Sequence, residues 1–192
     1  MSAVVMKDLL PRHRITVDEY YRMSEVGLLA SDARTELIDG EVIEMPPIGS
    51  PHAAAVSRLQ DLLFSATKGR AQLRVQNPIR LDICSEPQPD LAVLLSRKDF
   101  YWERHPLPPD TLLVIEVSDS SLRFDVNVKV PLYAQHEVPE VWVVDLVHAQ
   151  IHFFRSPQNG TYADVSVTDK PGVVALIALP EVEVNLTELF GS

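Results

Sequence analysis

Two short and almost uninterrupted apolar segments constrain most strongly what this chain can fold into. Residues 90–95 read DLAVLL, and residues 112–117 read LLVIEV. A strand covered on one face alternates apolar and polar residues, whereas continuous runs of this length are typical of strands buried on both faces. The two segments therefore predict a central sheet that is enclosed on both sides.

Clear helix and turn signals precede the first apolar segment. Residues 16–24 form a predicted helix, with Thr16 as its N-cap and Glu19 at the third helical position, which is the capping-box pattern. A hairpin is predicted over residues 35–45, because the Asp-Gly pair at 39–40 is a strong two-residue turn signal.

A longer amphipathic helix follows the hairpin. Ser50 is its predicted N-cap, Pro51 suits the first helical position, and the Lys-Gly pair at 68–69 ends it. The apolar stripe of this helix consists of Val56, Leu59, Leu63 and Ala66.

The second half of the chain supplies the other elements of the sheet. A strand around residues 73–81 is interrupted by Pro78, which favours an edge position or a bulge. A helix is predicted between about residues 127 and 137, because Pro131 is tolerated in a first turn, and this places Lys129 in that turn. Further strands are expected at 141–145 and 151–155, and two short strands and a helical turn at 187–190 close the chain.

This order of elements predicts a mixed α/β fold with a central sheet flanked by helices. We expect a single domain over residues 1–192, with residues 1–15 as a flexible N-terminal extension. The longest apolar run, residues 173–179, is too short to span a membrane, and the N-terminus lacks the pattern of a signal peptide. We therefore expect a cytoplasmic protein without membrane contact.

The charge and cysteine content exclude several functions. The 192 residues include 17 Lys and Arg against 27 Asp and Glu, a formal net charge of −10. This balance argues against a general nucleic-acid coat protein, although it leaves room for a local basic groove. The single cysteine, Cys84, excludes an internal disulfide and a Cys-rich zinc site. The seven glycines form neither a dinucleotide-binding motif nor a P-loop.

Two carboxylates occupy unusual places in the predicted sheet. Asp90 starts one apolar segment, and Glu116 lies near the end of the other. Two carboxylates that converge at a sheet edge raise each other's pKa unless a cation lies between them, and Mg²⁺ suits such a pair. Lys129 follows Glu116 after one connection and is the candidate for orienting water or neutralising charge. The simpler interpretation is a turn Asp, a salt-bridged Glu and a solvated Lys.

Five stretches of the chain together resemble one family of nucleases. They are RTELIDGEVIEM (34–45), SPHAAAVSRL (50–59), EPQPDLAVL (86–94), LLVIEVSDSSLRFDVNVKVPLYAQHEVPEVWVVD (112–145) and LPEVEVNLTELF (179–190). The chain resembles the Uma-two family of endonucleases, a branch of the PD-(D/E)xK superfamily with the restriction-endonuclease-like fold. The short P-D and E-x-K motifs are weak alone, whereas the ordered set is specific.

The resemblance implies a metal site and a departure from the usual motif. The paired acids of the family fall on Asp90 and Glu116, and the backbone carbonyl of Val117 would complete the protein ligands of Mg²⁺, which Mn²⁺ could replace. The superfamily's lysine stands two residues after the glutamate, but here that position is Ser118. The resemblance suggests that Lys129 on the following helix takes its place.

Several other residues are auxiliary candidates. Glu36 resembles an early acidic residue that many superfamily members use to hold metal or metal-bound water. Asp125 is a candidate to pair with Lys129 or approach the metal. Gln76 is a candidate to orient water or contact substrate. His52 lies on the apolar stripe of its helix, where a buried, hydrogen-bonded His is the alternative to a site role.

Aromatic and basic residues offer candidates for substrate contact. Phe100, Tyr101 and Trp102 are consecutive and suit either a base-stacking platform or a packing or dimer contact. The basic residues that could gather beside the acidic site are Arg70, Arg74, Arg80, Arg97, Lys98, Arg104 and Arg123.

Two functions follow from these observations. The first is a Mg²⁺-dependent endonuclease that hydrolyses nucleic acid, with DNA as the expected substrate, by metal-activated water. The alternative is a non-catalytic or vestigial interaction module on the same fold. A homodimer is expected in either case.

Overall fold

The computed structural model describes residues 12–30 and 32–190. The chain divides into two compact units. The smaller unit is Met1–Pro46 with Asp82–Glu86, and the larger is Pro47–Leu81 with Pro87–Ser192. The expectation of one domain over residues 1–192 stays a prediction, and most of the expected extension 1–15 lies outside the described residues.

The smaller unit contains the predicted first helix and hairpin. Helix α1 (Val17–Glu25) has the predicted capping box, in which Thr16 and Glu19 exchange side-chain and backbone hydrogen bonds. Strands β1 (Thr35–Ile38) and β2 (Glu41–Glu44) form the hairpin. Gly40 in its turn has φ +79°, and a Cβ there would lie 2.6 Å from the Cβ of Arg14. Only glycine meets both requirements.

The larger unit is built on the predicted mixed central sheet, in the order β3-β4-β5-β6-β7-β8. Strands β5 and β6 are parallel, and every other neighbouring pair in this sheet is antiparallel. The strands are β3 (Ala71–Val75), β4 (Leu91–Leu95), β5 (Thr111–Ser118), β6 (Glu140–Asp145), β7 (Gln150–Gln158) and β8 (Thr161–Thr168). A separate two-stranded sheet contains β9 (Val173–Ala175) and β10 (Glu183–Asn185).

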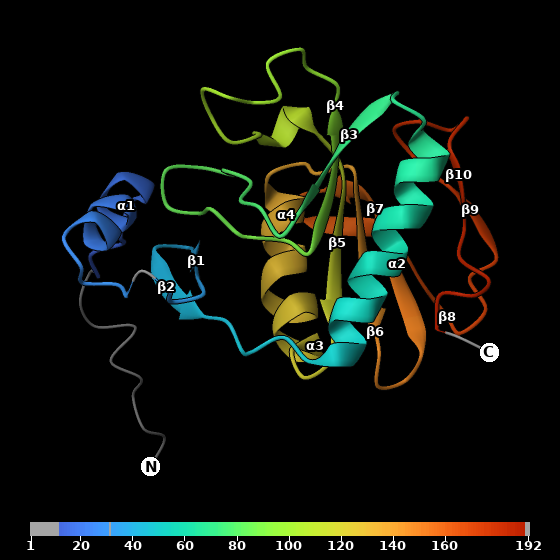
Figure 1. The fold of residues 1–192 in the computed structure, drawn as a ribbon, viewed down its shortest axis with the longest axis horizontal. Coiled ribbons are helices and arrows are strands. Elements are labelled where there is room, and N and C mark those ends of the chain that lie inside the picture. Colours follow the sequence, from blue (N-terminus) through green and yellow to red (C-terminus); the bar gives the residue numbers. More distant parts are fainter. Residues whose placement is uncertain (1–11, 31, 191–192) are drawn as a thin grey trace. The chain divides into compact units, whose positions relative to one another are not determined.

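Helix α2 (Ser50–Thr67) covers one face of the sheet (Figure 1). Its residues Val56, Leu59 and Leu63 belong to the main hydrophobic core. The predicted N-cap is wrong by one residue, because Gly49 precedes the first turn and makes no side-chain cap bond. The predicted end is confirmed, since Lys68 has a left-handed conformation and follows the last helical residue.

The opposite face of the sheet is covered by the connection between β5 and β6. It consists of α3 (Leu122–Phe124), a π-helical turn η3 (Asp125–Lys129) and α4 (Val130–Gln135). The predicted helix over about 127–137 is therefore present, but its predicted start near 126–127 is wrong. The helix begins five residues earlier, and a wide turn, in which the N–H of Val130 bonds to the carbonyl of Asp125, precedes the proline. The wide turn changes the local bonding where Pro131 lacks an N–H, and so Pro131 is tolerated inside the helical segment.

Three smaller predictions also need correction. Strand β3 ends at Val75, because Gln76 has φ +51° and the chain then leaves the sheet before Pro78. Strand β7 is longer than the predicted strand at 151–155, and three described strands, β8 to β10, follow it where two short strands were predicted. The turn predicted at residues 187–190 is present. Among the described residues, no helix combines the length and the apolar character needed to cross a membrane.

Candidate active site

Asp90 lies where strand β4 begins and its neighbour β5 continues. The Nε2–H of His52 and the backbone N–H of Val117 donate to Asp90 Oδ2, at 3.1 and 2.8 Å, and Gln76 Nε2 donates to Oδ1 at 3.2 Å. Two predicted auxiliary residues, His52 and Gln76, therefore hold the carboxylate of the predicted metal ligand Asp90. Burial acts to raise the pKa of Asp90, but the hydrogen bond and charge of His52, with the Val117 and Gln76 donors, outweigh it and lower the pKa.

Glu116 is buried on the face of β5 that lies under α4. Its neighbours Ile115 and Val117 belong to the core on the α2 side, and successive strand residues alternate between faces. Lys129 Nζ lies 3.3 Å from each Glu116 carboxylate oxygen, and the hydroxyl of Tyr133 donates to Oε1 at 2.7 Å. The lysine that the sequence predicts in place of Ser118 therefore reaches the glutamate from the helix.

Asp125 lies on the same helical segment and is also buried. The hydroxyls of Ser118 and Ser121 donate to its Oδ2 at 2.7 and 2.5 Å. Burial raises its pKa; the charge of Lys129 and the two serine hydroxyls oppose this rise, and the charge of Asp90 adds to it. Asp125 therefore interacts electrostatically with both Lys129 and Asp90.

The π-helical turn determines which side chains of the connection face the sheet. Asp125, Lys129 and Tyr133 are four residues apart and are all buried. In an α-helix each such step advances by about 40° around the axis, because a turn takes 3.6 residues. The wider turn at 125–129 rotates less per residue and offsets this drift. The three polar groups can therefore share one face, and π-turns of this kind often occur at functional sites.

The net charge of this cluster is negative. It contains three carboxylates, Asp90, Glu116 and Asp125, and one lysine, Lys129, with His52 at its rim. Like charges that gather in a buried site destabilise one another unless a cation compensates them. The arrangement favours the binding of a further positive charge.

The donor set fits a magnesium ion. An ionised carboxylate has about four acceptor positions, and the described residues occupy three of those on Asp90. The N–H and C=O of one strand residue point to the same side, so the carbonyl of Val117 faces the edge occupied by Asp90. The described residues hold no cluster of three or more His, Cys, Asp or Glu suited to a metal. Mg²⁺ needs only one or two carboxylates, since water and phosphate complete its shell.

One predicted residue belongs to the other unit, and another functional residue was not predicted. Glu36 is buried on β1 of the smaller unit, and its auxiliary role stays a prediction. Tyr133, whose hydroxyl donates to Glu116, was not predicted from the sequence. Its spacing of four residues from Lys129 was the available signal.

Comparisons with known proteins agree with this fold. The family model Uma2, described as “Putative restriction endonuclease”, matches residues 17–187. A solved structure described as a “putative nuclease belonging to DUF820” from Anabaena variabilis superimposes with a TM-score of 0.68. The sequences are 19% identical, and the match covers 92% of this chain and 97% of the other. A search of curated proteins finds no match. The restriction-endonuclease-like fold predicted from the sequence is confirmed.

Proposed function

The chain belongs to the Uma2 family, and from this premise we propose that it is a magnesium-dependent endonuclease that hydrolyses the phosphodiester bonds of DNA. Mn²⁺ would replace Mg²⁺ in the same site. A homodimeric state and a cytoplasmic location remain predictions from the sequence.

One observation supports this proposal above the others. Three carboxylates, of which Glu116 and Asp125 are buried and Asp90 is partly buried, lie with one lysine and one histidine where β4 begins and β5 continues. A purely structural cluster gains stability from balanced charge, whereas a surplus of buried acid costs folding free energy. A surplus of acidic side chains is tolerated in catalytic metal sites, because the bound metal ion supplies the positive charge that the side chains lack.

The metal would be held by the carboxylates of Asp90 and Glu116 and the carbonyl of Val117. When bound, Mg²⁺ supplies a Lewis acid that lowers the pKa of water and stabilises charge on the phosphate. Asp90 suits this role because its lowered pKa keeps it ionised, and His52 and Gln76 hold its carboxylate in one orientation.

Lys129 is the proposed catalytic cation. Its Nζ contacts both oxygens of Glu116, so it is positioned beside a proposed ligand rather than in solvent. From there it would orient the attacking water or neutralise charge that develops on the phosphate. Tyr133 holds the other side of Glu116, and Asp125 offsets part of the lysine charge.

Calorimetric titration with Mn²⁺ tests the proposal without any assumption about sequence preference. We expect the wild-type protein to bind Mn²⁺ and the Asp90→Ala/Glu116→Ala variant to lose this binding. The matched control is Asp61→Ala/Glu181→Ala, which removes two exposed acids outside the cluster. The same three proteins are then assayed for Mg²⁺-dependent nicking of plasmid DNA. Equal metal binding in the first variant and in the control would contradict the proposed site.

A further inference from the structure

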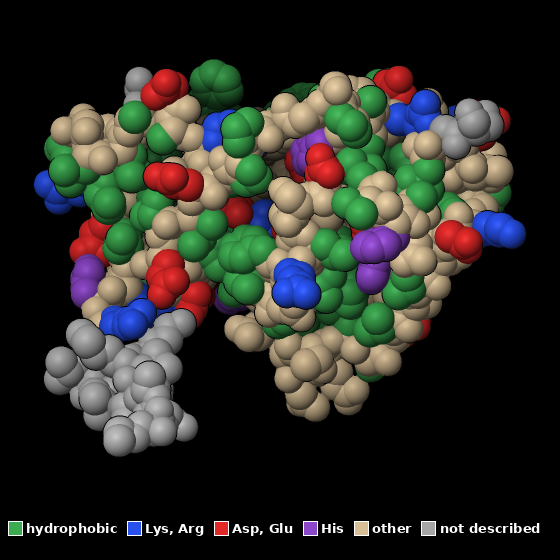
Figure 2. Space-filling model, turned by 90° about the horizontal axis from the view of Figure 1, so that it is seen from below, with side chains coloured by type: hydrophobic (Ala, Val, Ile, Leu, Met, Phe, Trp, Pro, Cys, Tyr) green, Lys and Arg blue, Asp and Glu red, His purple; other side chains and the backbone are tan. Residues whose placement is uncertain are grey.

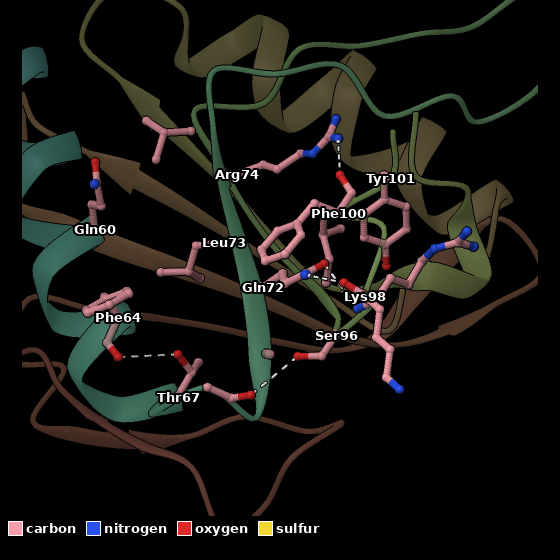
Figure 3. A pocket seen from close by; sticks show the side chains of 15 residues that line it. Gln60, Phe64, Thr67, Gln72, Leu73, Arg74, Ser96, Lys98, Phe100 and Tyr101 are labelled. Carbon is pink, nitrogen blue, oxygen red and sulfur yellow. Dashed lines mark hydrogen bonds between the residues drawn. The ribbon is translucent and has the colours of Figure 1, made fainter. Parts of the chain in front are cut away.

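A groove along the edge of the sheet is the second feature of the larger unit that suggests a ligand. Strand β3 runs through it, α2 provides one wall and residues 96–101 provide the other (Figure 3). The groove has a volume of about 680 Å³. In the described part of the sheet β3 pairs with β4 alone, so the other edge of β3 is open to the groove.

The groove is positively charged in a negatively charged protein. Its lining contains Arg74, Arg97 and Lys98 and no Asp or Glu. Arg97 pairs with the neighbouring Asp99, so Arg74 and Lys98 supply the excess positive charge. The whole chain, in contrast, has ten more acidic than basic residues. On the face seen in Figure 2, Lys and Arg side chains are scattered singly among other residues. Charge complementarity therefore points to an anionic ligand in this groove.

Two exposed aromatic rings flank the edge strand. Phe64 on α2 is 73% exposed, and Phe100 in the opposite wall is 72% exposed. Figure 3 shows them on the two sides of β3. Isolated exposed hydrophobic residues are common, but two aromatic rings beside Arg74 and Lys98 form a combined surface. Such a surface suits a ligand in which flat, uncharged rings are joined by anionic groups.

Phe100 is held in its exposed position by its neighbour. Tyr101 is buried, its hydroxyl donates to the carbonyl of Leu95 at 2.6 Å, and Arg97 lies 5.0 Å from its ring centre. Arg74 donates to the carbonyl of Phe100 at 3.3 Å. Both aromatic residues have positive φ, +51° and +58°, which side chains of this size seldom adopt. The ring of Phe100 is thus presented to solvent by an ordered loop.

The groove leads directly to the candidate active site. Val75 lines it and ends β3, and the next residue, Gln76, donates to Asp90. Four steps of ~3.3 Å along β3 provide room for at most about four nucleotides at a spacing of ~3.4 Å or more.

We propose that this groove binds a single-stranded segment of the nucleic-acid substrate. Bases stack on Phe64 and Phe100, phosphates contact Arg74 and Lys98, and the strand continues past Gln76 to the acidic cluster. Stacking requires exposed base faces, which a duplex hides, and aromatic–base stacking with backbone contacts is typical of single-strand binding. The proposal rests on the nuclease function proposed above, and it specifies the form of the substrate.

The test is fluorescence anisotropy with a short fluorescein-labelled oligo(dT) strand in EDTA, where no cleavage occurs. We expect Phe64→Ala/Phe100→Ala to weaken binding by at least about tenfold. Trp102→Ala is the matched control, because Trp102 lies in the same loop, is 91% exposed and does not line the groove. Lys98→Ala should weaken binding more than Lys170→Ala, since Lys170 is an exposed lysine outside the groove.

The outcomes separate this proposal from the proposed nuclease function. Unchanged oligo(dT) affinity in the Phe64/Phe100 variant would overturn the groove as the binding site. Preference for duplex over single strand, or no binding by the wild type, would overturn the single-stranded occupant. Loss of a wild-type dimer in this variant, with unchanged oligo(dT) binding, would identify a second copy of the chain as the occupant. Oligo(dT) binding that depends on the two rings, without any cleavage in Mg²⁺, would support the groove and contradict the nuclease.

Discussion

Two buried glutamates on neighbouring strands of the same sheet have opposite surroundings. Glu140 on β6 accepts from Trp142 Nε1 at 2.7 Å and from Arg155 Nε at 2.8 Å, and its other oxygen accepts the N–H of Ile177 at 2.9 Å. Glu116 on β5 instead shares the charge of Lys129 with Asp125. The donors around Glu140 balance its charge, whereas the groups around Glu116 leave a surplus.

This difference teaches which buried charge stabilises the fold and which one serves chemistry. A carboxylate that pairs with a cation of its own and has no second acid beside that cation needs nothing from outside the chain. A carboxylate placed beside other carboxylates is stabilised by a cation from outside. Burial alone does not distinguish the two, since Glu116 and Glu140 are 3% and 0% exposed.

The largest expected effect is a loss of catalytic activity when Glu116, but not Glu140, is replaced. Glu116→Gln should lower the rate of DNA cleavage by about 10³–10⁴-fold, because it removes a charged metal ligand. The melting temperature should change little, since the amide still accepts from Tyr133 and Asp125 still compensates the charge of Lys129. Plasmid nicking and thermal melting measure the two effects. Retention of more than a tenth of the wild-type rate would contradict the assigned role.

The second effect is a loss of folding stability when Glu140 is replaced. Glu140→Gln should lower the free energy of unfolding by about 3 kcal/mol, because Arg155 loses its charge partner and one amide NH₂ faces donors. We expect the low end of the usual range because the Arg155 side chain is 21% exposed. Urea denaturation measures the loss. The folded fraction should cleave DNA at the wild-type rate, and a stable but inactive variant would reverse the comparison.

A third prediction compares the two cations. Lys129→Met keeps the length of the side chain and removes its charge, and should lower the cleavage rate by about 10²-fold. Mn²⁺ affinity should stay equal or increase, since the lysine no longer competes for Glu116. Arg155→Met is the matched control and should reduce stability rather than turnover. Equal losses of turnover and Mn²⁺ affinity in the lysine variant would argue that Lys129 only supports the site.

The smallest effect concerns Asp125 and its dependence on pH. Burial raises the pKa of this carboxyl above its value in the unfolded chain. Its ionisation therefore lowers stability as the pH rises through the folded-state pKa, and no such penalty exists below the unfolded pKa. Asp125→Asn removes the penalty and should stabilise the protein by about 1 kcal/mol at neutral pH, a typical size for a stabilising substitution.

Urea denaturation in EDTA over a series of pH values tests this prediction. The advantage of Asp125→Asn over the wild type should be small in acid and should increase toward neutral pH. An advantage that is constant with pH would show that the substitution acts through packing rather than charge.

Local patterns explain which parts of the fold can be predicted from the sequence. The apolar segments at 90–95 and 112–117 predict β4 and β5 within one residue, and the capping box predicts α1. These signals depend on residues close in the chain, so they can be recognised without knowledge of tertiary contacts. The start of the β5–β6 connection cannot be predicted in this way, because the wide turn at 125–129 depends on packing against the sheet.

The candidate site shows the same division. Asp90, Glu116 and Lys129 could be singled out, because charges at the ends of apolar strands are costly and because the chain resembles a nuclease family. Tyr133 had only its spacing of four residues from Lys129 as a signal, and the Ser118–Asp125 hydrogen bond had none, since both contacts arise only when the connection lies over β5. Phe64 had a signal, because it is a large apolar residue outside the stripe of its helix.

The π-turn at 125–129 has a consequence for the tolerated length of the chain. A π-turn is equivalent to one residue inserted into an α-helix. Deletion of a single residue between Asp125 and Lys129 would restore regular α-helix and leave Asp125 and Tyr133 seven residues apart, still within about 20° of the same face. Insertion of a residue into the regular helix after the turn would instead rotate Asp125 by about 100° relative to the residues beyond the insertion. The connection between β5 and β6 should therefore tolerate the loss of one residue from this turn better than the gain of one residue in α4.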